Sequence, residues 1–187
     1  SGTVQTFTTT VRADGTYSVD VPNALAEGPY TAVANVSGPG GSGAAGNDNG
    51  IVDITLPIIT VDAPALTKDS TPPLTGSTDL PAGSTITLTV TGANGVSQLF
   101  SAPVQPGGTF SIDVPAALVN GPFSVLARGT DAAGNSATAT DNGVVDNIAP
   151  VITVDAPALT NDTTPPLTGT TDLPVGATVT LTVTGAN

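Results

Sequence analysis

Three features of this 187-residue sequence predict an all-β fold, made of antiparallel β-sandwich modules that follow one another along the chain. Apolar runs rich in β-branched residues alternate with polar residues, turn residues separate the runs, and the pattern recurs after 93 residues, the distance from Ile59 to Ile152. A hydrophobic period of two residues is typical of strands with one buried face. No stretch of helix length has a convincing 3.6-residue apolar period, so helices are not expected.

The alternating runs predict strands in one module at residues 59–63, 74–78, 84–91, 110–114 and 123–127. A proline ends the first of these runs, and a Pro-Pro pair precedes the second. The third is the clearest, because Ile86, Leu88 and Val90 face one way and threonines face the other. About seven short strands in such a period are typical of an Ig-like antiparallel β-sandwich, and the repeat implies a tandem, end-to-end array of them.

Turns and core residues follow from the same alternation. Proline, glycine, asparagine and aspartate separate the strands, and the glycine-rich residues 38–46 are expected to form a flexible turn between the last two strands of the first copy. The aromatic side chains that alternate onto inward faces are expected in the core. They are Phe110, Phe123, Tyr17 and Tyr30.

The repeat sets the domain organisation but leaves its phase open. Residues 59–94 and 152–187 are identical at 30 of 36 positions. The most linker-like segments, 53–57 and 146–150, predict one complete module at 58–150, the later part of a repeat at 1–57 and the early part of the next at 151–187. The alternative phase has modules at 1–93 and 94–187.

Composition excludes several classes of function. The chain has 3 basic and 15 acidic residues, a net charge of −12, and neither histidine nor cysteine. We therefore expect no nucleic-acid partner and no disulfides, and no catalytic residues or enzyme activity, because a nucleophile or acid–base set cannot be assembled. No apolar run is long enough for membrane insertion. An acidic surface of this kind favours hard cations such as calcium.

Several motifs resemble a known family. ITVDAP, GTFSIDVP, TDAAGN and VDNIAP, beginning at residues 59, 108, 130 and 145, are similar to bacterial Ig-like tandem repeats. Such repeats form the extender regions of giant surface adhesins of the RTX and biofilm-associated type. The resemblance implies a secreted protein at the bacterial cell surface, whose repeats form a stalk with junctions stiffened by calcium. The first copy departs from the pattern, because it has GPGGS where the second has DAAGN.

Loop positions place oxygen donors at the expected junctions. In a sandwich of alternating strands, successive loops fall at opposite ends. Four residues are expected to converge at the first junction: Asp53, Asp79, Asp131 and Asn135. Three are expected at the second: Asp69, Asp146 and Asp172. Calcium takes about six to eight such oxygen ligands. The alternative for each residue is that it only caps its own turn.

The sequence therefore predicts structural extender repeats of a secreted bacterial adhesin, which space a ligand-binding tip from the cell. Their expected partners are the neighbouring repeats of the same chain, and the tip ligand lies outside this segment. Two alternatives stay open. One is an Ig-like module that binds a carbohydrate or a protein, and the other is an accessory domain of a secreted polysaccharide-active enzyme.

Overall fold

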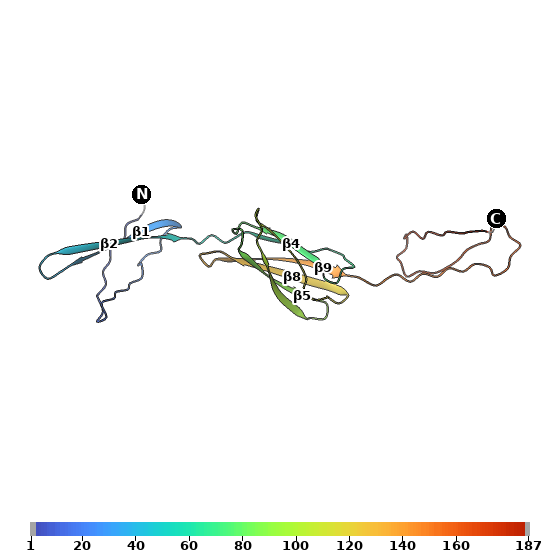
Figure 1. Cartoon of the computed structure of the whole chain (residues 1–187), viewed down its shortest axis with the longest axis horizontal. Helices are drawn as coiled ribbons and strands as arrows, with labels where there is room; N and C mark the ends of the chain where they lie inside the picture. The colour runs from blue at the N-terminus through green and yellow to red at the C-terminus, as the bar shows by residue number, and fades with distance from the viewer. Residues whose placement is uncertain (1–2, 186–187) are drawn as a thin grey trace.

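The chain is elongated in a computed structural model that describes residues 3–185. A β-sandwich occupies the middle of the long axis, a two-stranded hairpin lies on one side of it, and the C-terminal segment lies on the other (Figure 1). A helix long and apolar enough to cross a membrane is absent from the described residues.

The central sandwich consists of two antiparallel sheets that face each other. The smaller sheet has the order β3-β4-β7, with β3 (Ile59–Asp62), β4 (Pro73–Thr78) and β7 (Thr109–Asp113). The larger has the order β6-β5-β8-β9, with β5 (Thr85–Thr91), β6 (Ser97–Pro103), β8 (Gly121–Thr130) and β9 (Ser136–Val145). Every pairing within these sheets is antiparallel, which confirms the predicted all-β sandwich.

The core lies between the two sheets and follows the alternation in the sequence. Ile86, Leu88 and Val90 of β5 are completely buried, and so is Leu74 of β4. The threonines between the β5 residues face away from the core, as the period-two pattern predicts. Phe110 joins this cluster from β7, so aliphatic and aromatic side chains from both sheets form one continuous core.

Two aromatic rings of the core pack directly on glycines of a neighbouring strand. A Cβ atom at Gly76 would overlap the Phe110 ring and the backbone oxygen of Thr60. A Cβ atom at Gly143 would overlap the Phe123 ring in the same manner. Each glycine is therefore required by the close approach of a ring.

The end segments repeat parts of the central module at the same offset. β1 (Gly28–Ser37) pairs with β2 (Gly43–Val52) in the register in which β8 pairs with β9, since Gly28 lies opposite Val52 and Gly121 lies opposite Val145. At the other end, the bridge between Ile152 and Thr171 repeats the pairing of β3 with β4.

Two expectations for the first copy were wrong. The turn between β1 and β2 covers only residues 38–42, because residues 43–46 continue the ladder of β2 opposite β1. Tyr17 and Tyr30 are 57% and 40% exposed, whereas Phe110 and Phe123 are buried as predicted. The Tyr30 ring packs on Gly50 as the Phe123 ring packs on Gly143, but the strands that cover Phe123 in the central module have no paired counterpart beside β1 among the described residues.

Candidate functional site

The first junction is the linker of residues 53–57 between β2 and β3, and the loop between β8 and β9 contacts it. Asn135 donates one hydrogen bond from Nδ2 to the backbone oxygen of Asp53, at 3.0 Å, and another to Oδ2 of Asp131, at 2.9 Å. One side chain therefore links the central sandwich to the residues that precede it.

The loop that carries Asn135 is held by the carboxylate of Asp131. Its Oδ1 accepts hydrogen bonds from the backbone N–H groups of Gly134 and Asn135, both at 2.8 Å. The hydrogen bond from the Asn135 side chain is the main cause that lowers the pKa of Asp131 below its ordinary value, with those two backbone bonds adding to it. Asp131 is therefore ionised at neutral pH.

Asp79 and Asp53 complete the predicted set at this junction. Oδ1 of Asp79 accepts a hydrogen bond from the Ile58 N–H group at 2.8 Å, and Oδ1 of Asp53 accepts one from Thr55 at 3.1 Å. Three of the four predicted residues are therefore bonded to the linker or to one another, and Asp79 is bonded to Ile58, which directly follows the linker.

The second junction is the linker of residues 146–150, and it has a similar arrangement. The Asp146 N–H group donates to the Thr67 carbonyl at 2.8 Å. Asp69 lies two residues beyond Thr67 and caps its own turn through Thr71. Asp172 accepts from Val151 at 2.9 Å, which repeats the bond between Asp79 and Ile58 one period later.

The donor chemistry at both junctions fits calcium, but the donors are not assembled. Apart from Asp131, each predicted aspartate uses Oδ1 in a hydrogen bond, and no hydrogen bond among residues 3–185 uses its Oδ2. These free carboxylate oxygens are the ligands that calcium prefers. Among the described residues, however, no group of three acidic side chains is close enough to hold a metal ion.

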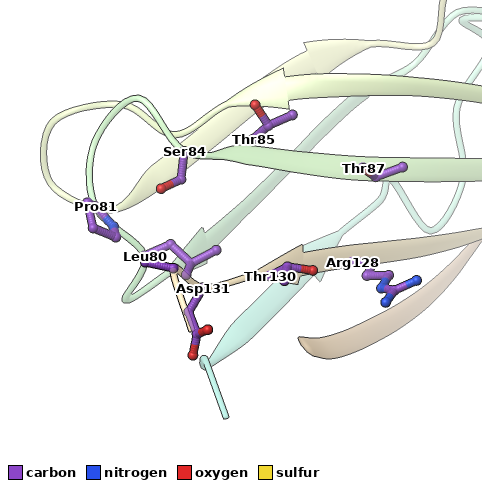
Figure 2. A pocket seen from close by; sticks show the side chains of 9 residues that line it. Leu80, Pro81, Ser84, Thr85, Thr87, Arg128, Thr130 and Asp131 are labelled. Atoms are coloured by element: carbon purple, nitrogen blue, oxygen red, sulfur yellow. The ribbon is translucent and has the colours of Figure 1, made fainter. Parts of the chain in front are cut away.

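A depression of about 570 Å³ lies beside the first junction, between β5, β8, the loop that precedes β5 and the loop that follows β8. Figure 2 shows Asp131 at one end of this depression and Arg128 further along β8. Its lining is mostly small and hydroxylated, and it includes no aromatic side chain.

Sequence reasoning missed two residues that fix the linkers. Asn120 accepts a hydrogen bond from the Asn147 N–H group at 3.2 Å, and Glu27, one period earlier, accepts one from the Thr55 hydroxyl at 2.5 Å. Because the residue type differs between the two copies, the motif comparison gave no signal at this position.

Comparisons with known proteins agree with this architecture. The family described as "Bacterial Ig-like domain" matches residues 60–147. The crystal structure of a tetra-tandem repeat in the extending region of a large adhesion protein is 30% identical, with a TM-score of 0.50 and coverage of 87% of this chain. The chain spans only 44% of the length of that structure. No curated protein matches the chain.

Two further structures have lower TM-scores. A bacterial immunoglobulin-like domain from the M. primoryensis ice-binding adhesin is 26% identical, with a TM-score of 0.33, and the match covers 49% of this chain and 99% of that domain. A Ca²⁺-stabilized adhesin that helps an Antarctic bacterium reach out and bind ice is also 26% identical, with a TM-score of 0.41, and the match covers 78% of this chain and 39% of that one.

The tetra-tandem repeat comes from the extending region of an adhesion protein, which agrees with the prediction that the chain is not an enzyme. Its four repeats in series also agree with the tandem organisation predicted from the 93-residue period. The central module of this chain, residues 60–147, therefore matches the bacterial Ig-like domain family, and the chain is similar to the tandem repeats in the extending region of a large adhesion protein.

Proposed function

We propose that this chain is a length of the extender stalk of a bacterial surface adhesin, and that its role is to separate a binding tip from the cell. The observation that carries the proposal is the serial arrangement of equivalent segments, which lie one after another along a single long axis (Figure 1). The similarity to repeats from the extending region of a large adhesion protein supports it.

The same arrangement supports module boundaries at the two linkers. In the alternative phase, with modules at 1–93 and 94–187, the boundary would fall in the turn between β5 and β6. These two strands pair over seven residues in one sheet, from Thr85 opposite Pro103 to Thr91 opposite Ser97. A boundary there would divide one sheet between two modules, so we assign the complete module to residues 58–150.

A stalk predicts that length grows in proportion to the number of repeats. β9 has ten residues, or about 33 Å, and the five residues of the linker add up to about 17 Å. In dilute solution, chains lengthened by one, two and three further periods are expected to gain about 50 Å each in maximum dimension by small-angle X-ray scattering. A gain that follows the cube root of mass would show collapse into a globule and would contradict the proposal.

We also propose that calcium rigidifies the junctions. Asp53, Asp79, Asp131 and Asn135 would contribute oxygen ligands at the first junction, and Asp69, Asp146 and Asp172 would do so at the second. The free Oδ2 atoms around each linker support this assignment. The carboxylates must first move together, so we expect weak binding in the range of extracellular calcium modules, with Kd of about 10⁻⁴–10⁻³ M.

Calcium at ten times Kd is expected to stabilise the folded chain by about 1.4 kcal/mol, which raises the thermal midpoint by about 6–11 °C over its value in excess chelator. Asp146→Asn is expected to reduce this calcium-dependent shift. Asp48→Asn removes the same charge from β2, at a residue outside both sets of proposed ligands, and should keep the full shift. The measurement is thermal unfolding followed by circular dichroism, and identical midpoints in calcium and in chelator would rule out the junction metal.

A further inference from the structure

The sequence contains four Asn-Gly dipeptides, and they sit in different surroundings in the fold. In such a dipeptide the asparagine side chain is prone to deamidation, because glycine has no side chain to shield the backbone nitrogen that attacks it. The asparagines are Asn49, Asn94, Asn120 and Asn142. The reaction also needs a backbone that can rotate, so the structure determines which of the four can react.

Three of the four glycines are held in strand ladders, each opposite a residue of the neighbouring strand. The pairs are Gly50 with Tyr30, Gly121 with Val145, and Gly143 with Phe123. The aromatic rings of two of these partners also lie directly against the glycines. The glycine nitrogen must rotate toward the preceding asparagine side chain before it can attack, and a paired strand resists this rotation.

The fourth dipeptide, Asn94 with Gly95, lies in the turn between β5 and β6. Both residues are exposed, and a Cβ atom at Gly95 would meet no atom within 4 Å. Gly95 has a φ of +76°, and its N–H group donates to the Gly92 carbonyl at 2.9 Å. This is a single bond at the tip of a hairpin, so it opens without disturbing the ladders of the sheet.

The side chain of Asn94 is already bent back over the main chain that follows it. Its Oδ1 accepts a hydrogen bond from the Val96 N–H group at 3.2 Å. This turn directs the side-chain carbonyl along the chain, toward the Gly95 nitrogen that lies between the two residues. The Val96 N–H group also stabilises the negative charge that develops on Oδ1 when the carbonyl carbon is attacked.

We propose that Asn94 is a modification site, at which the folded chain deamidates spontaneously through a succinimide. The Gly95 nitrogen gives its proton to water and bonds to Cγ of Asn94, and the side-chain nitrogen takes up a proton and leaves as ammonia. One water molecule then opens the ring. Cleavage between the nitrogen and Cγ gives aspartate, and cleavage between the nitrogen and the main-chain carbonyl carbon gives isoaspartate. The inference does not depend on the extender function.

The new negative charge arises close to the second junction. Ala93 lies against Gly121, because a Cβ atom added there would be only 2.7 Å from that of Ala93. Gly121 follows Asn120, whose side chain accepts the hydrogen bond from Asn147 of the linker. Isoaspartate also lengthens the main chain of the turn by one atom. Deamidation at Asn94 therefore changes both the charge and the packing beside this linker.

The test is peptide mapping by mass spectrometry after the folded 187-residue chain is incubated at mildly alkaline pH in water enriched in heavy oxygen. The water that opens the ring leaves a heavy oxygen atom in the product, so earlier deamidation is not counted. We expect Asn94 to react at least about tenfold faster than each of the other three asparagines, and to give both aspartate and isoaspartate. A reaction at Asn94 no faster than at the others would overturn the inference.

Two controls separate the fold from the dipeptide. In concentrated urea the four asparagines are expected to react at similar rates, and an advantage of Asn94 that persists there would overturn the structural basis.

Gly95→Ala is expected to slow deamidation at Asn94 at least about tenfold, because the added methyl group shields the attacking nitrogen. Gly83→Ala is the matched control. Gly83 also has a positive φ, +91°, and open space at its Cβ position, but it follows Ala82. Asn94 should react at the unaltered rate in this variant. An unaltered rate in Gly95→Ala would overturn the succinimide route.

Discussion

Leu88→Ala is expected to lower the free energy of unfolding of the central module by about 2–5 kcal/mol. Leu88 is completely buried at the centre of β5, which pairs on both sides with β6 and β8, so the cavity cannot be filled by a shift of an edge strand. A domain of this size has only about 5–15 kcal/mol in total, and it has no disulfide to restrict the unfolded chain. The measurement is urea unfolding at equilibrium.

Thr87→Ala is the matched control for this prediction. Thr87 is the preceding residue of the same strand and faces solvent, so its loss changes the strand propensity but leaves the core intact. We expect a change of less than about 1 kcal/mol. If the two variants were equally stable, the core would not depend on the alternation of β5.

Gly76→Ala is expected to destabilise the same module by about 3 kcal/mol, at the upper end of the usual cost of overpacking. The added methyl group would overlap both the Phe110 ring and the backbone oxygen of Thr60, and the backbone cannot rotate away as a side chain can. Relief would require β3 to move from β4 or Phe110 to leave the core. Urea unfolding measures this loss directly.

Gly46→Ala makes the same chemical change where space is open. A Cβ atom at Gly46 meets no atom within 4 Å, and the equivalent position of β9 already holds Ala139. We expect no loss of stability for the central module. A free energy of unfolding for Gly76→Ala equal to that of the unaltered chain would contradict the close approach of the ring.

The fold was predictable because its signal is local and repeated. Alternation in β5 and β8 indicates which side chains are buried, and the 93-residue period multiplies that evidence. β6 and β9 were harder to see as strands, because both carry several polar residues on their exposed faces and lack the β-branched run of β5. The exposure of Tyr17 and Tyr30 could not be read from local alternation, since burial depends on which partner strands are present.

The junctions were predictable in outline only. Alternating loop ends predict Asp53, Asp79 and Asp131 at one junction; in the structure Asp53 bonds to Thr55, Asp79 to Ile58 and Asp131 to Asn135. Sequence does not indicate that Asn135 links the two sides through a backbone carbonyl, because that contact depends on the path of the linker. Metal binding at these residues stays a prediction, since the positions of the loops do not fix the distances between carboxylates.

The bond between Thr67 and the end of β9 has a mechanical consequence. Thr67 pairs in parallel with Val145 through two backbone hydrogen bonds, one to the Val144 carbonyl and one from the Asp146 N–H group. The chain enters the module at one end through β3 and leaves it at the other through β9 (Figure 1). Tension applied along the stalk would pull the segment of Thr67 and the end of β9 in opposite directions. Both hydrogen bonds would then bear the shear force together, and both would have to break before the module could open.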